Sequence, residues 1–435
     1  MFDTLRAAWR KNERIVSNFF SLSVLQFANY LAPLITVPYL VRVLGPEKFG
    51  LVAFANAFTL YLVTLSDYGF RWSATRKIAI FREDRNRRNS IFSAVILIRF
   101  GLMVLGLIIL AALLALVPKF GSEWRVYLFA FGTVVGNVLF LDWFFQGMER
   151  MKYITLLSLI GRVIFTVAIF IFIEEPREYV YVPLFNSLGI VTVGVASLWV
   201  VYRRFDTRFS IPSLGAVREE LRDGWHVFMS VATAKVYTIG MPLILGFFAP
   251  YASVGFYTAG EKIVQAGTCM LEPFMRAIFP HIGHLSSKSR ESAVVLLRSI
   301  VRVIGPLTLL MSLGVVLLAP QIAGLILGAR YVESIAVIRI LAFLFFAKGL
   351  GHIFLLQTML NFRHDREVFR IVLAAAVLCV ISSLVLIPSL SHRGAAMAAL
   401  IPEVAMLLLS GSFVQKRYKL MGWHVLNRGG TSGDA

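Results

Sequence analysis

The chain has 435 residues, of which 58% are hydrophobic and only 15% charged, and its mean hydropathy is +0.76. This composition excludes an ordinary soluble domain, in which about a quarter of the residues are charged. A net charge of +19 would indicate a nucleic-acid partner in a soluble protein. Here the basic residues gather in the tails and in alternate loops, which is the positive-inside pattern of a membrane protein, so no nucleic acid is expected.

Apolar runs of about 20 residues, the length that a helix needs to cross a bilayer, follow one another along the chain. They predict about twelve transmembrane helices, near 16–43, 50–70, 90–117, 124–146, 154–173, 180–202, 225–248, 253–279, 296–319, 334–356, 370–388 and 394–414. The predicted fold class is all-α, a polytopic membrane protein with two pseudo-symmetric six-helix lobes. The expected divisions are an N-terminal lobe (1–202), a cytoplasmic inter-lobe linker (203–224), a C-terminal lobe (225–414) and a cytoplasmic tail (415–435). Both termini are expected to be cytoplasmic.

The first apolar run is too long for the core of a signal peptide and lacks a small-residue cleavage site, so it is expected to remain as the first helix. It carries Gln26 and Asn29, which we assign to a substrate cavity as partners for hydroxyl groups. Pro38 and its later counterpart Pro242 are candidate kinks with a gating role or a packing role.

The second and third spans add charged candidates. Asn56 and Arg99 are assigned to the substrate cavity, and Asp67 is a candidate for ion coupling. Asp67 precedes Arg71 by four residues, a spacing at which opposite charges meet on one face of a helix. We interpret this pair either as part of a cytoplasmic gate between the lobes or as a local helix-stabilising pair.

The seventh and eighth spans carry the densest polar pattern. Along the eighth span, polar residues at spacings of 3 or 4 occupy one helical face: Thr258, Glu261, Gln265, Thr268, Glu272 and Arg276. Helix packing explains such a face as well as a water-filled cavity does. Glu261 favours the cavity, because a carboxylate within the membrane is costly unless it faces water or a partner. The cavity assignment therefore includes Lys235, Tyr237, Glu261, Lys262 and Gln265; Glu261 and Glu272 join Asp67 as ion-coupling candidates, and Glu272 with Arg276 joins the gate.

The two halves of the chain repeat each other. Pro38 and Pro46 recur 204 positions later as Pro242 and Pro250. At an offset of 205, the second half repeats Gly50, Asp67 and Arg71 as Gly255, Glu272 and Arg276. Duplicated membrane bundles are typical of transporters, and the second and eighth spans are expected to face one another.

Several classes of protein are excluded or disfavoured. The sequence contains no G-x-x-x-x-G-K-[ST] phosphate loop, no H-E-x-x-H or cysteine-rich metal site and no G-x-S-x-G nucleophile motif. Cys269 and Cys379 lie within predicted spans and are interpreted as small apolar residues. Because the predicted outer loops are short, an integral polymerase or acyltransferase is disfavoured, as is an inert scaffold. We expect no enzyme activity, no metal and no cofactor beyond a coupling H⁺ or Na⁺.

Four segments carry a resemblance to a known family: NFFSLSVLQFANYLAPLITVPYLVRVLGPEKFGLVAFANAF (18–58), DYGFRWSATRKIA (67–79), AP-x4-GFYTAGEKI (249–263) and LGARY (327–331). With these segments the chain resembles the polysaccharide (O-antigen, Wzx-type) flippases of the multidrug/oligosaccharidyl-lipid/polysaccharide (MOP) exporter superfamily. The likeness spans nearly the whole chain.

The resemblance implies alternating access between two lobes, and movement of an undecaprenyl-diphosphate-linked oligosaccharide from the cytoplasmic to the outer leaflet of a bacterial inner membrane. It also implies membrane lipids as partners, with a polysaccharide polymerase and a chain-length regulator as further partners. Lys235 and Lys262 agree with the cationic lumen of that family. A multidrug exporter, or an exporter of another lipid-linked precursor, is the alternative within the same superfamily.

Overall fold

The computed structural model describes the backbone of residues 2–269, 271–418 and 420. Within these ranges it describes the side chains except those of 2–32, 234, 236–239, 272, 273, 276 and 277. The described elements are helical, and the chain forms two compact units, Met1–Gly246 (unit 1) and Phe247–Ala435 (unit 2).

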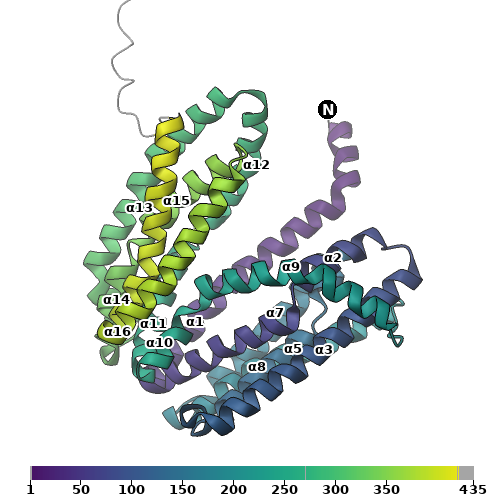
Figure 1. Cartoon of the computed structure of the whole chain (residues 1–435), viewed down its shortest axis with the longest axis horizontal. Helices are drawn as coiled ribbons and strands as arrows, with labels where there is room; N and C mark the ends of the chain where they lie inside the picture. Colours follow the sequence, from purple (N-terminus) through teal and green to yellow (C-terminus); the bar gives the residue numbers. More distant parts are fainter. Residues whose placement is uncertain (1, 270, 419, 421–435) are drawn as a thin grey trace, which may run out of the picture. The chain divides into compact units, whose positions relative to one another are not determined.

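Unit 1 begins with a long helix and continues with shorter ones (Figure 1). Its elements are α1 (Phe2–Asp67), α2 (Phe70–Ile80), α3 (Arg85–Leu116), α4 (Pro118–Gly121), α5 (Trp124–Leu139), α6 (Asp142–Gly147), α7 (Met151–Phe172), the 3-10 helix η1 (Pro176–Val180), α8 (Tyr181–Arg204), α9 (Leu214–Ile239) and most of α10 (Met241–Phe248). The helical backbone of α1 is interrupted at Gly45, whose φ is 72°. α1 therefore contains the first predicted span and most of the second.

Unit 2 continues from the end of α10. Its elements are α11 (Tyr251–Thr268), α12 (Glu272–Lys288), α13 (Arg290–Ile326), the 3-10 helix η2 (Ala329–Tyr331), α14 (Ser334–Leu341), α15 (Leu344–His352), the π-helix η3 (Ile353–Leu360) and α16 (Asp365–Tyr418). α16 contains the last two predicted spans, which meet at Ser391, where φ is 51° and ψ is −126°.

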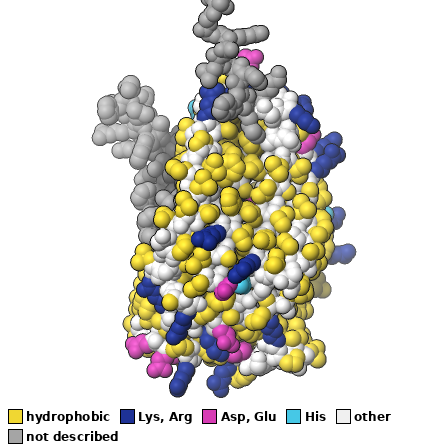
Figure 2. All heavy atoms as spheres, turned by 90° about the vertical axis from the view of Figure 1, so that its left-hand side faces the viewer, with side chains coloured by type: hydrophobic (Ala, Val, Ile, Leu, Met, Phe, Trp, Pro, Cys, Tyr) yellow, Lys and Arg dark blue, Asp and Glu magenta, His cyan; other side chains and the backbone are white. Residues whose placement is uncertain are grey.

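Every predicted span consists mostly of helix, which confirms the all-α, polytopic fold class. Among the described residues, 8 helices are long and apolar enough to cross a membrane. One of them, Asp365–Tyr418, holds two predicted spans, and Pro33–Ile80 holds the second predicted span and part of the first. The fourth, seventh, eighth and tenth predicted spans are each divided by a helix break. On the face drawn in Figure 2, hydrophobic side chains cover most of the middle and charged side chains gather mainly toward the ends.

The helix breaks follow the internal repeat. α1 and α2 are separated at Tyr68–Gly69, and α11 and α12 are separated after Thr268. A second pair of breaks, between α5 and α6 at Phe140–Leu141 and between α14 and α15 at Ala342–Phe343, lies at nearly the same spacing. The duplication is thus visible in where the helices stop as well as in the sequence.

Part of the predicted linker is helical. α9 begins at Leu214, where the Ser213 hydroxyl oxygen accepts a hydrogen bond of 3.2 Å from the Ala216 N–H and caps the helix. The helix continues through the acidic and basic stretch 218–223 and packs against α1, α2 and α3. Compact unit 1 therefore extends past residue 202, to Gly246.

Small residues bring α5 and α8 into close contact. A Cβ atom on Gly136 would lie 2.7 Å from the backbone carbon of Ile190, and one on Gly194 would lie 2.6 Å from Cβ of Leu139. Without a hydrophobic driving force between helices in lipid, close approach through small residues is the usual source of packing energy. This contact fixes the C-terminal end of α5, which is where the candidate site begins.

Candidate functional site

The first feature of the site is the turn between α1 and α2. Tyr68 and Gly69 have φ values of 48° and 75°, so the chain leaves the helix for two residues. A Cβ on Gly69 would lie 2.8 Å from Cγ1 of Val227, and the Tyr68 ring stacks on Phe228 with ring centroids 4.9 Å apart. Glycine is required here both by the positive φ and by the close approach of α9.

The second feature is the break between α5 and α6. Backbone groups that a break sets free must find partners inside a membrane protein. The Ser197 hydroxyl of α8 donates to the carbonyl oxygen of Leu139 at 2.9 Å and accepts from the Leu141 N–H at 3.2 Å. Ser197 therefore satisfies one acceptor and one donor at the break.

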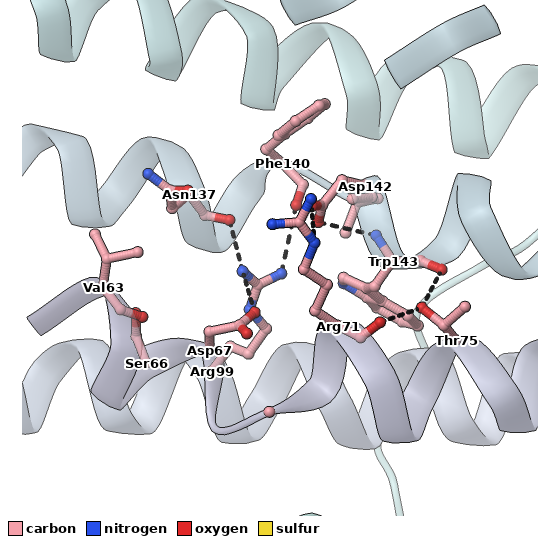
Figure 3. A network of polar contacts seen from close by, with 12 residues as sticks. Val63, Ser66, Asp67, Arg71, Thr75, Arg99, Asn137, Phe140, Asp142 and Trp143 are labelled. Atoms are coloured by element: carbon pink, nitrogen blue, oxygen red, sulfur yellow. Dashed lines mark hydrogen bonds and ion pairs between the residues drawn. The ribbon is translucent and has the colours of Figure 1, made fainter. Parts of the chain in front are cut away.

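Arg99 of α3 joins the two breaks (Figure 3). Its side chain is buried, with the residue 2% exposed. Nη2 donates to the carbonyl oxygen of Asn137 at 2.8 Å and lies 3.5 Å from Oδ1 of Asp67, while Nη1 donates to the carbonyl oxygen of Phe140 at 3.4 Å. A lone arginine at the membrane centre costs about 2.5–3.5 kcal/mol or more, and these partners offset that cost. We call Arg99, Asp67 and the two carbonyl groups the Arg99 junction.

The predicted local pair of Asp67 and Arg71 is corrected by the structure. Asp67 ends α1 and pairs with Arg99, whereas Arg71 lies beyond the turn and its Nε is 3.6 Å from Oδ2 of Asp142, the first residue of α6. The spacing rule for opposite charges assumes a continuous helix, and the turn at Gly69 removes that condition.

Ion pairs also fix the far end of α2. Lys77 Nζ lies 2.8 Å from carboxylate oxygens of Glu220 and Asp223 and 3.2 Å from Glu219, all on α9. The Lys77 side chain is 12% exposed and that of Glu220 is 4% exposed. Arg82, just after α2, forms two hydrogen bonds of 2.8 and 3.0 Å with Glu149, just after α6. α2 is thus tied to α9 and to α6.

In unit 2 the predicted polar face lies on α11. Glu261 is half-buried and accepts a hydrogen bond of 3.1 Å from the Tyr257 hydroxyl. Lys262 Nζ donates to Oε1 of Gln265 at 3.0 Å. Thr258 is buried, whereas Gln265 is exposed, so the polar face passes from the interior of unit 2 to its surface.

In unit 2, neutral amide side chains bind backbone carbonyl groups, as the charged Arg99 does in unit 1. Gln357 of η3, 2% exposed, donates from Nε2 to the carbonyl oxygen of Met275 on α12 at 2.6 Å. Asn361 donates from Nδ2 to the carbonyl oxygen of Phe279 on the same helix at 3.4 Å. These bonds hold α12 against η3.

The other predicted residues are distributed as follows. Asn56 on α1 and Lys235 on α9 are half-buried, and the Tyr61 hydroxyl donates to the carbonyl oxygen of Lys235 at 3.4 Å. Arg99 was predicted to line a substrate cavity, but its guanidinium group is occupied inside unit 1. Five predicted side chains lie outside those that the structure describes: Gln26, Asn29, Tyr237, Glu272 and Arg276.

Sequence reasoning missed the contributions of Asn137, Phe140 and Asp142. Asp142 was recognisable as an acid within an apolar run, where a charge is costly. Asn137 and Phe140 contribute only carbonyl oxygens to the Arg99 junction, so their side chains carry no signal for it. Among the described residues, no group of three or more His, Cys, Asp and Glu side chains is placed to hold a metal ion.

Comparisons with known proteins agree on the class of protein. Residues 15–286 match the family described as polysaccharide biosynthesis protein. A relative from Escherichia coli (strain K12), named "Putative O-antigen transporter", is 32% identical over 93% of this chain and 97% of its own length. A relative of the same name from Shigella dysenteriae is 27% identical over 72% of this chain and 78% of its own length. These are names of transporters, in agreement with the expectation that the chain is not an enzyme.

Solved structures share the fold at low identity. The lipid II flippase MurJ in an inward closed conformation aligns with a TM-score of 0.70 at 12% identity, over 92% of this chain and 87% of its own. An inward-facing multidrug resistance MATE family transporter of the MOP superfamily aligns with a TM-score of 0.68 at 16% identity, over 93% and 99%. Its fold is shared with a transporter of the MOP superfamily, and on its sequence match the chain belongs to the polysaccharide biosynthesis protein family.

Proposed function

We propose that this chain is a flippase that moves a polyprenyl-diphosphate-linked oligosaccharide, such as an O-antigen repeat unit, from the cytoplasmic to the outer leaflet of a bacterial inner membrane. The observation that carries the proposal is the 32% identity with the Escherichia coli O-antigen transporter relative, which extends over nearly the full length of both chains. Both termini face the cytoplasm in this proposal, in keeping with the basic tails and loops.

The chemistry of the substrate sets the demands on the protein. A diphosphate headgroup with sugars cannot cross the hydrocarbon core unaided, because desolvating charged and polar groups is costly. The headgroup needs cations and hydrogen-bonding groups, while the polyprenyl tail can stay in lipid. Lys235 and Lys262 supply cations, and Gln265 is an exposed amide beside Lys262. Asn56 is assigned to the same path as a partner for sugar hydroxyls.

We propose alternating access coupled to H⁺ or Na⁺. Of the candidate coupling carboxylates with a described side chain, Asp67 already has Arg99 as a partner, whereas the described partner of Glu261 is a neutral hydroxyl. Glu261 is therefore the better candidate for taking up a coupling cation. A polysaccharide polymerase and a chain-length regulator are proposed as partners that act on the translocated product.

The test is lipid transfer by purified protein in proteoliposomes. The substrate is a fluorescent polyprenyl-diphosphate oligosaccharide, and a membrane-impermeant reagent reports how much of it has reached the other leaflet, with and without a pH or Na⁺ gradient. Transfer faster than in protein-free vesicles is expected, and Lys262→Ala should slow it. Glu261→Gln should remove the response to the gradient while leaving downhill transfer. Equal rates with and without protein would refute the proposal.

The same vesicles also distinguish the proposed flippase from a multidrug exporter. A cationic dye that accumulates in the presence of the protein, with no effect on the lipid-linked sugar, would favour drug export. Arg330→Ala is the matched control for Lys262→Ala, because it removes an exposed basic residue from the loop element η2. Its transfer rate should equal that of the unchanged protein.

A further inference from the structure

α2 and α6 form a pair with its own contacts. Each begins directly after a helix break, and each contributes to one hydrophobic cluster. A Cβ on Gly147 of α6 would lie 2.7 Å from Cβ of Ile78 on α2, so the two backbones are close. The Thr75 hydroxyl of α2 lies 3.0 Å from the carbonyl oxygen of Trp143, and ion pairs join the two helices at both ends. These links hold α2 and α6 together as one body.

Apart from the ion pairs of Lys77 with α9, the pair contacts the rest of unit 1 mainly through apolar side chains. The same hydrophobic cluster includes residues of α3, α7 and α8, among them Phe92, Ile98, Leu157 and Val193. Such apolar contacts have little directionality and permit small sliding movements. Directional contacts at the two breaks come from Arg99, whose guanidinium group reaches the end of α1 and the end of α5 at once. Nε of Arg99 is buried and has no hydrogen-bond partner among the described residues. Its N–H group is therefore available to bind another acceptor after the helices move.

We propose that Arg99 is the positioning residue for transport in unit 1. While it binds Asp67 together with the carbonyl groups of Asn137 and Phe140, the two breaks are held in register. Release of Asp67 lets α2 and α6 move as a pair about the turn at Tyr68–Gly69 and the break at Phe140–Leu141. The proposal rests on the proposed function, because it names the part of unit 1 that moves when access alternates.

The test is hydrogen–deuterium exchange of the full chain in lipid nanodiscs, without substrate. Asp67→Asn keeps the shape of the side chain and removes its charge. Because the ion pair between Asp67 and the buried Arg99 is lost, we expect exchange in residues 70–80 and 142–147 to rise together, by at least about tenfold. Exchange in α8 should stay unchanged. Asp67→Glu keeps the carboxylate and should retain most of the protection.

Two further variants sharpen the test. Arg99→Lys should act like Asp67→Asn, because a single ammonium group cannot reproduce the fork of the guanidinium group. Glu149→Gln is the matched control: it breaks an exposed ion pair between the ends of the same two helices and should leave exchange unchanged. If Arg99→Lys does not fold, the two Asp67 variants decide the question alone.

Unchanged exchange in Asp67→Asn would overturn the proposal. So would a rise that includes α8 equally, because it would mean that Asp67 only stabilises unit 1 as a whole. A rise in residues 70–80 without one in 142–147 would show that α2 and α6 do not move together, and would also overturn it. The measurement needs no substrate, so a protein that fails to flip lipid-linked sugar would refute the proposed function and leave this result standing.

Discussion

Replacing Gly136 with alanine should destabilise the protein, because α5 and α8 touch at this position. The new Cβ would lie 2.7 Å from three atoms of Ile190 and Val191, where ordinary contacts are 3.4–4 Å. α5 and α8 would have to move apart by roughly 1 Å, and such overpacking costs about 1–3 kcal/mol. Alanine also gains about 0.5–1 kcal/mol over glycine within a helix, so the net loss should be about 0.5–2 kcal/mol. The shift would also displace the Asn137 carbonyl from Arg99, and transport should fall with it.

The assay is thermal unfolding of the purified full chain in one detergent, followed by tryptophan fluorescence. Gly101→Ala is the matched control, since a Cβ on this α3 glycine would meet no atom within 4 Å and alanine there should be neutral or slightly stabilising. Gly136→Ala should unfold a few degrees below that control. A Tm equal to or above that of Gly101→Ala would refute the reasoning about α5 and α8.

The next predictions concern the stability that is lost when ion pairs are broken. Lys77→Met leaves Glu220, whose side chain is 4% exposed, without its cation, and this should cost about 3–5 kcal/mol of stability. Arg85→Ala removes an ion pair with Asp206 in which the two side chains are 54% and 56% exposed, and this should cost less than about 1 kcal/mol. Equal losses of Tm would contradict this ranking. Glu403→Gln removes the carboxylate 3.5 Å from Lys348, which lies within the predicted span 334–356, and should cost about 2.5–3.5 kcal/mol in the same assay; an unchanged Tm would refute it.

The helices were predictable because the bilayer imposes a length on apolar segments, and each predicted span consists mostly of helix. The break between α5 and α6 was not predicted. The residues that flank it, Phe140 and Leu141, include neither proline nor glycine. The break depends on Ser197 and Arg99, which are distant in sequence and supply the hydrogen bonds that make it tolerable in a membrane.

The candidate site was predictable in part. The internal repeat and the cost of charge in a membrane drew attention to Asp67, and the structure places Asp67 at a junction of helices. Arg99 was not predicted as its ion-pair partner, because the spacing to Arg71 was interpreted on an unbroken helix, although Gly69 lies between Asp67 and Arg71. The cavity residues Asn56, Lys235 and Lys262 stay predictions, since periodicity fixes a helical face but not what that face contacts in the assembled protein.

The contrast between a charged junction in unit 1 and neutral amides in unit 2 has an electrical consequence. Moving Arg99 away from Asp67 across the bilayer would displace charge, whereas breaking the bond between Gln357 and Met275 would not. The resting voltage of a cell does work of about 2.3 kcal/mol per elementary charge carried through 100 mV. An energised membrane would thus bias release of Arg99 from Asp67 and leave the breaking of the bond between Gln357 and Met275 insensitive to voltage.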